Sequence, residues 1–296
     1  MHSTKLAFRI TMLTAALAML ACENEITITL KNNNNRLVVS GTFTNDTTIH
    51  SIRLSSSSLF VSGIRPTVVT GARVYLTCNT DTIHFIENKD TSGLYQTPTK
   101  CYGVGGKTYR LHITDVDVDK DGKIDSFTSI STMPIAIKFD SLKFDSGYYG
   151  NGKYIQCNTA YYQSTSNGPD YVYDFISING NEISPLSKKL GHGELKMAMS
   201  SIEQTTPKQP HFLYFGSDNK FAHPGDRVTY TAYNFTRKQY DFLLAFDNNT
   251  NGDPFIDNIF DQLTIPNRLG TNIEPSQKAG GYFMVYSISR ISKEYQ

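Results

Sequence analysis

The sequence predicts a mainly β protein, in which two β-rich domains follow a short leader and the second domain carries one or two short helices. Alternation is the first observation: Tyr109, Leu111 and Ile113 are apolar and the residues between them are polar, as in a half-buried strand. The second is that clusters of Gly, Asn, Asp and Pro separate many such short segments, as in sandwiches and barrels. At 296 residues the chain has room for one large β domain or two smaller ones, and we favour two.

Residues 1–22 have the features of a lipoprotein signal peptide. Lys5 and Arg9 supply positive charge, an apolar stretch follows, and the small residue Ala21 precedes Cys22. The stretch is shorter than the roughly 20 apolar residues of a permanent membrane helix. We therefore expect lipid on Cys22 and attachment to a membrane; the alternative is an ordinary cleaved signal with a chance cysteine.

Residues 23–35 have the composition of a polar tether. They include four consecutive asparagines and too few apolar residues to pack, so we expect them to hold the body off the membrane. Glu23 and Glu25, which follow Cys22, resemble the acidic export tags of surface lipoproteins in Bacteroidota. That resemblance implies a body outside the cell.

The first β domain is expected at residues 36–133. Glycines mark a turn before each of the strand segments near 71–76, 91–95 and 105–111. This layout resembles the transthyretin-like and carboxypeptidase-regulatory-like sandwiches, which are small immunoglobulin-like domains used as accessory or binding modules. We therefore expect an immunoglobulin-like β-sandwich that ends near Pro134.

The second domain, residues 134–296, is expected to be β-rich and aromatic. A helix is predicted near 237–247, because Thr236 and Gln239 form a capping-box pattern ahead of an apolar run. Strands are predicted at 135–139, 171–178, 212–215, 227–233 and 282–288.

Three cysteines, Cys78, Cys101 and Cys157, follow the leader, an odd number for an oxidising compartment. Cys78 and Cys101 lie on neighbouring β segments and are the favoured disulfide pair. The alternative is that all three are buried as small apolar side chains.

An acidic segment places carboxylates at alternate positions before Gly122, a spacing that suits calcium. The expected ligands are the side chains of Asp117, Asp119, Asp121 and Asp125 and the backbone carbonyl of Lys123.

This loop departs from an EF-hand, because predicted strands flank it and Thr128 stands where a bidentate Glu is usual. We expect a structural calcium site with an affinity of about 0.1 to 1 mM. The alternative is a solvated acidic hairpin tip.

Composition and motifs argue against several functions. A net charge of +1 with 19% charged residues gives no reason to expect nucleic-acid binding. The chain has no G-x-S-x-G, H-E-x-x-H, Cys-x-x-Cys or phosphate-binding glycine loop, so we predict no catalytic residues and no enzyme. The 18 Tyr and 17 Phe suit ligand stacking or, alternatively, β-sheet cores.

Seven short segments together resemble a known family. They are RLVVSG at 36–41, GARV at 71–74, SGLY at 92–95, GKTY at 106–109, RKQYDF at 237–242, GDPF at 252–255 and GYF at 281–283. In this order they resemble the Bacteroidota lipoproteins that carry domain of unknown function 4249. The resemblance implies an outer-membrane lipoprotein, often encoded beside a TonB-dependent receptor, and no established catalytic residues.

The sequence therefore favours a surface-exposed, lipid-anchored outer-membrane protein that captures a ligand for, or partners, a TonB-dependent transporter. One alternative is a structural or adhesive surface lipoprotein without a transporter, and a hydrolase with distant carboxylates ranks third. The sequence identifies neither the ligand nor the residues that bind it.

Overall fold

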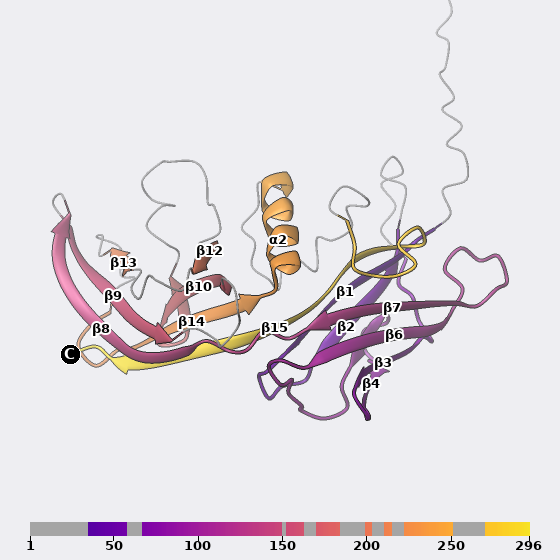
Figure 1. Ribbon diagram of the computed structural model, residues 1–296, viewed down its shortest axis with the longest axis horizontal. Coiled ribbons are helices and arrows are strands. Elements are labelled where there is room, and N and C mark those ends of the chain that lie inside the picture. Colours follow the sequence, from indigo (N-terminus) through magenta and orange to yellow (C-terminus); the bar gives the residue numbers. More distant parts are fainter. Residues whose placement is uncertain are drawn as a thin grey trace, which may run out of the picture. The chain divides into compact units, whose positions relative to one another are not determined.

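The computed structural model confirms a mainly β fold (Figure 1). It describes residues 35–57, 67–149, 152–162, 170–183, 199–202, 210–214, 222–250 and 270–296. The first strands are β1 (Leu37–Thr44), β2 (Ser51–Ser56), β3 (Arg73–Cys78), β4 (Asp81–Glu87), β5 (Leu94–Gln96), β6 (Thr108–Val116) and β7 (Asp125–Thr132). The later elements are β8 (Lys138–Tyr149), β9 (Gly152–Tyr162), β10 (Asp170–Ile178), β11 (Asn181–Ile183), β12 (Met199–Ile202), β13 (Pro210–Tyr214), β14 (Arg227–Phe235), helix α2 (Arg237–Thr250) and β15 (Ala279–Glu294).

Within these ranges the strands form one twelve-stranded mixed sheet and one three-stranded sheet. The large sheet has the order β11-β10-β14-β15-β1-β2-β5-β4-β3-β6-β7, with β12 paired to β10. The small sheet has the order β13-β9-β8. The β1–β15 pair is parallel, whereas the strands on either side of it, β2 and β14, run antiparallel to their partners.

Strand β15 joins the N-terminal and C-terminal strands of the large sheet (Figure 1). Its residues up to Tyr286 pair with β1, and those from Ser287 onward pair with β14. Gly281 permits the close approach to β1, because its φ is +78° and a Cβ there would overlap the Val39 carbonyl. The strand predicted at 282–288 is confirmed and is longer than expected.

The main core lies among the strands of the first predicted domain. The alternation of β6 is confirmed, since Tyr109, Leu111 and Ile113 are all buried. Phe283 and Val285 of β15 belong to the same apolar cluster. The C-terminal strand therefore completes the N-terminal core, and each large side chain buried there contributes about 1.5 to 3 kcal/mol.

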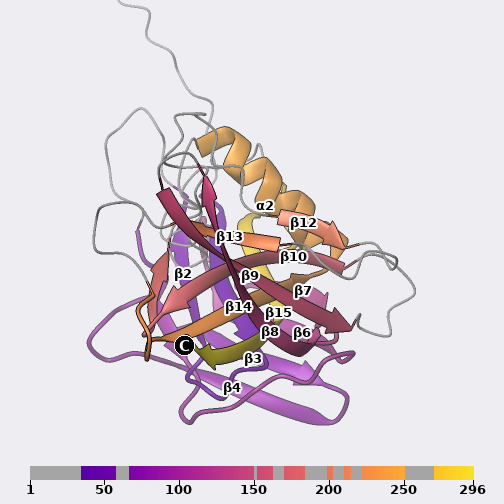
Figure 2. The same cartoon turned by 90° about the vertical axis from the view of Figure 1, so that its left-hand side faces the viewer.

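Helix α2 begins where the capping-box pattern predicts. The Thr236 N–H donates to Gln239 Oε1 at 2.8 Å, and the Gln239 N–H donates to Thr236 Oγ1 at 3.4 Å. The helix contacts β10 and β14 (Figure 2), and Phe242 and Leu243 pack in one cluster with residues of β15. The helix runs past the end of the predicted range, 237–247.

Predicted strands of the second half occur as β10, β13 and β14, with small shifts at their ends. The strand predicted from Ile135 is wrong in its start, because β8 begins at Lys138 and Ile135 is exposed. The Ile135 carbonyl accepts a hydrogen bond from the Asn234 side chain at 3.0 Å, in place of a neighbouring strand. The division into domains at 133 and 134 stays a prediction.

Candidate metal centre

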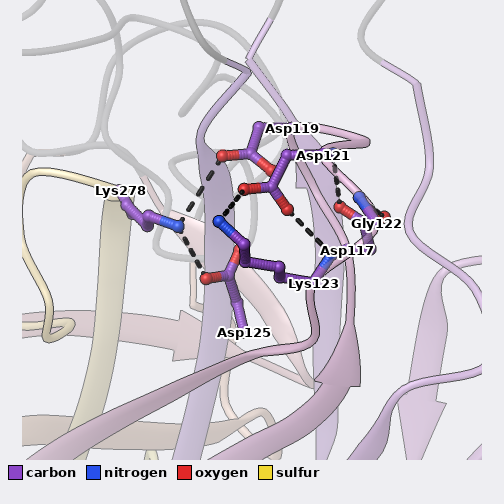
Figure 3. Close-up of polar contacts among 7 residues, drawn as sticks. All are labelled: Asp117, Asp119, Asp121, Gly122, Lys123, Asp125 and Lys278. Atoms are coloured by element: carbon purple, nitrogen blue, oxygen red, sulfur yellow. Dashed lines mark hydrogen bonds and ion pairs between the residues drawn. The ribbon is translucent and has the colours of Figure 1, made fainter.

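The predicted calcium loop connects β6 to β7 (Figure 3). Val116 and Val118 are buried and anchor the base of the loop in the core. Lys120 and Gly122 have positive φ angles of 58° and 83°, and these left-handed residues turn the chain back towards β7. The apolar residues turn inward, and the intervening Asp117 and Asp119 are partly buried beside them.

Local hydrogen bonds shape the loop. The N–H groups of Asp121 and Gly122 donate to the two carboxylate oxygens of Asp117 at 3.1 and 3.0 Å. The Lys123 N–H donates to Asp121 Oδ1 at 2.8 Å. Such side-chain to backbone bonds are typical of turns rich in Asp, and here they set the local shape of the loop.

Three of the predicted carboxylates lie close enough together to bind one cation. One oxygen from each of Asp117, Asp119 and Asp121 lies within 4.8 Å of the others. Calcium binds oxygen at about 2.3 to 2.6 Å, so two oxygens on opposite sides of the ion are about 5 Å apart. The spacing therefore fits a single calcium ion.

Asp119 supplies a reason for a cation to bind. Its side chain is 11% exposed, compared with 39% for Asp121. Its Oδ1 is buried and has no hydrogen-bond partner among the described residues. A buried carboxylate oxygen without a partner destabilises the fold, and a coordinated cation would remove that penalty. This atom favours the calcium interpretation over a fully solvated acidic tip.

The fourth predicted carboxylate, Asp125, forms an ion pair in place of joining the other three. Lys278 Nζ donates to Asp125 Oδ1 at 2.7 Å and lies 3.6 Å from Asp119 Oδ2 (Figure 3). The hydrogen bond to Asp125 raises the pKa of Lys278 above its ordinary value. Lys278 is 153 residues away in sequence, so no local spacing pattern predicts this contact.

Lys123 was expected to offer its backbone carbonyl. In the structure its N–H binds Asp121, and its Nζ lies 3.7 Å from Asp121 Oδ2. Lys123 and Lys278 therefore both place positive charge beside the carboxylates, which offsets part of their negative charge without a bound cation. The geometry fits calcium, and binding itself stays a prediction.

A family comparison adds to this geometry. Residues 23–292 match the family described as "Domain of unknown function (DUF4249)". The protein belongs to the DUF4249 family. The resemblance inferred from the seven short segments is thus confirmed at the level of the family. No curated protein matches the chain.

Solved structures add little to the DUF4249 assignment. One match is "Crystal structure of chicken CNTN1 FN1-FN3 domains", at 8% sequence identity and a TM-score of 0.28. The alignment covers 67% of this chain and 60% of that chain. That TM-score is too low to assign a shared topology.

The cysteine pair of this DUF4249 protein is not bonded in the structure. Cys78 and Cys101 are both free, in place of the predicted disulfide. Both are partly buried and pack against the main core as small apolar side chains. Burial raises the pKa of the Cys101 thiol, which favours its unreactive protonated form. The side chain of Cys157 lies outside the described residues.

Two further predictions concern the membrane and the aromatic residues. Cys22, the predicted lipid site, lies outside the described residues. No helix within the described ranges is long and apolar enough to cross a membrane. Tyr171 and Tyr173 are partly buried and pack against an apolar cluster, which agrees with the alternative that these aromatics fill the core.

Proposed function

We propose that this DUF4249 protein is an outer-membrane lipoprotein, anchored through Cys22 with its body on the cell surface. The observation that carries the proposal is the order of features along the chain. The family match begins at residue 23, directly after Cys22, so the signal-like leader ends where the family body begins. Lipid attachment at such a junction would tether the whole body through its first residue.

The proposed role is that of an accessory subunit of a TonB-dependent transporter, which captures a ligand or covers the outer face of the barrel. The partner and the Bacteroidota lineage come from the family resemblance. The near-neutral charge of +1 is compatible with a protein partner or a small ligand. The proposal assigns no catalytic residue.

Within this role the acidic loop serves as a structural calcium site. An affinity of about 0.1 to 1 mM is that of extracellular calcium modules. Such a site fills only where calcium is plentiful, which agrees with a body outside the cell. Bound calcium would satisfy Asp119 Oδ1 and hold the loop between β6 and β7.

The anchor is tested by metabolic labelling with a palmitate analogue. Cys22→Ala should abolish the label and release the protein from the membrane fraction. Cys101→Ala, which changes a cysteine of the body, is the matched control and should keep both the label and the membrane attachment. Equal labelling of the two variants would disprove the anchor.

The transporter role is tested by a mild detergent pull-down from outer membranes, with mass spectrometry and protease treatment of intact cells. We expect a large TonB-dependent barrel in the eluate and cleavage of the body by external protease. A surface-exposed body without a barrel would overturn the accessory role and favour a structural or adhesive one. A body protected from protease would contradict the surface location.

A further inference from the structure

A polar pocket lies beside the start of α2 and shares no lining residue with the predicted calcium ligands. Its volume is about 640 Å³, within the usual range of small-molecule sites. It is lined by residues 128–132 of β7, residues 236–239 at the start of α2, Thr271, Asn272, Glu274 and Tyr282. Serine, threonine and amide side chains dominate this lining.

The first turn of α2 presents hydrogen-bond donors to this pocket. The Tyr240 N–H donates to the Thr236 carbonyl, which is the first intrahelical bond, and the Gln239 N–H is capped by Thr236. The backbone N–H groups of Arg237 and Lys238 precede that bond and have no acceptor among the described residues. A helix start with free N–H groups and a positive dipole end attracts anions.

Ser129 provides an independent indication of a ligand. Its side chain is 2% exposed, and its Oγ has no partner among the described residues. Ser131, two positions along β7 and so on the same face, accepts a hydrogen bond from Gln239 Nε2 at 3.0 Å. That face of β7 therefore turns towards the start of α2. Ser129 is among the residues that line the pocket, and its unsatisfied Oγ is buried at the pocket wall.

Lys238 is the charged residue of the lining that could balance a negative group. Arg237 is held by Asp241 at 2.9 Å, whereas Lys238 has no ion-pair partner among the described residues. Glu274 is the carboxylate of the lining, and its Oε2 accepts a bond from the Ser276 N–H at 2.9 Å. Asp241 therefore balances the charge of Arg237, and Lys238 is left as the cation of the lining without an ion-pair partner among the described residues.

We propose that this pocket binds the carboxylate or phosphate group of a small molecule. The N–H groups of Arg237 and Lys238 and the Ser129 hydroxyl would donate to its oxygens, and the Lys238 ammonium would balance its charge. The start of α2, with Lys238, and the buried hydroxyl of Ser129 come from segments more than 100 residues apart in the sequence. The site is independent of the lipid anchor and of the transporter, so its test does not depend on either.

The test is calorimetric titration of the full-length protein in detergent with inorganic phosphate and, separately, with succinate. We expect at least one probe to bind with a dissociation constant at or below about 1 mM. Ser129→Ala should weaken binding by about fivefold to tenfold, because one donor is lost. Ser126→Ala, an exposed serine of β7 outside the pocket, is the matched control and should bind as the parent does.

Lys238→Gln should also weaken binding, and more strongly at low salt, whereas Lys107→Gln, an exposed lysine outside the pocket, should not. Binding of phosphate alone would point to a phosphorylated ligand, and binding of succinate alone to a carboxylic acid. The proposal fails if neither probe binds up to about 10 mM. It also fails if Ser129→Ala and Ser126→Ala bind equally well.

Discussion

Strand β7 borders two sites that are built in different ways. At its start, the acidic loop contains three clustered carboxylates within five consecutive residues. Hydrogen bonds inside the loop set its shape. Further along, the polar pocket combines β7 with the start of α2, Thr271, Asn272, Glu274 and Tyr282. The first site depends on local turn chemistry, whereas the second exists only when the strands and the helix have packed.

Gln239 is the residue on which the packing of the second site depends. It is 1% exposed, and its Nε2 donates to both Ser131 Oγ and the Val285 carbonyl at 3.0 and 2.9 Å. Its Oε1 accepts the Thr236 N–H. One amide therefore caps the helix and ties it to β7 and β15. The acidic loop has no comparable residue, since Lys278 reaches it through a half-exposed side chain.

The largest effect is expected for Gln239→Ala. The change removes three hydrogen bonds and leaves the Val285 carbonyl and the Thr236 N–H without their partner. We expect the free energy of unfolding to fall by about 2 to 4 kcal/mol, from unsatisfied buried groups and a lost cap. Urea unfolding followed by circular dichroism measures this loss.

Lys238→Ala is the matched control, because it changes the neighbouring exposed residue of the same helical turn. It should alter the free energy of unfolding by less than about 0.5 kcal/mol. If Gln239→Ala behaves like this control, the helix start does not depend on the hydrogen bonds of the Gln239 side chain. If Gln239→Ala changes calcium affinity as strongly as stability, the two sites are not independent.

Calcium should have the next largest effect, confined to the first site. With a dissociation constant of about 0.1 to 1 mM, 10 mM calcium would raise the free energy of unfolding by about 1.4 to 2.7 kcal/mol. Asp119→Asn should remove most of this gain, because it neutralises the buried ligand. Thermal unfolding in the presence of calcium and of a chelator measures this stabilisation.

Asp81→Asn is the control for this prediction, since it neutralises an exposed aspartate at the β3–β4 turn. It should retain the full calcium effect. An equal gain in the Asp119 and Asp81 variants would mean that calcium acts on the general charge of the protein. No gain in the parent protein would leave the acidic loop as a solvated tip.

The two sites also differ in how far the sequence predicts them. Alternation at Tyr109, Leu111 and Ile113 and the capping box at Thr236 and Gln239 are local patterns, and the structure confirms both. The acidic spacing predicts four clustered carboxylates, and three of them cluster, whereas Asp125 pairs with Lys278. These predictions succeed because strand, cap and turn each depend on residues within a few positions of one another.

Long-range contacts are not predictable in this way. The Lys278–Asp125 ion pair spans 153 residues, and the Gln239–Ser131 bond spans 108. No periodicity or spacing links such residues. Strands β7 and β15 lie far apart in the strand order and meet only through tertiary packing. Cys78 and Cys101 are both free for a similar reason. Two cysteines on neighbouring segments form a disulfide only when the fold brings them into the required geometry.

Lys278→Gln sharpens the comparison, because it alters a long-range contact of the acidic loop. Lys278 Nζ lies within 4 Å of Asp119 and Asp125, so its charge competes with a bound cation. Removing it should tighten calcium binding by about fivefold or more, because two unit charges 4 Å apart in water repel by about 1 kcal/mol and calcium carries two charges. Calcium titration by calorimetry measures this, and Lys107→Gln is the control. Unchanged or weaker binding would show that Lys278 does not compete with the ion.

The smallest expected effect separates two serines on one face of β7. Ser131→Ala removes the acceptor of Gln239 Nε2 and should lower the free energy of unfolding by about 1 kcal/mol. Ser129→Ala, in protein without ligand, removes a buried hydroxyl that has no partner among the described residues, so stability should stay the same or rise by up to about 1 kcal/mol. Urea unfolding of both variants measures the contrast. If Ser129→Ala destabilises the protein as much as Ser131→Ala, the hydroxyl of Ser129 already has a structural partner and is not kept for a ligand.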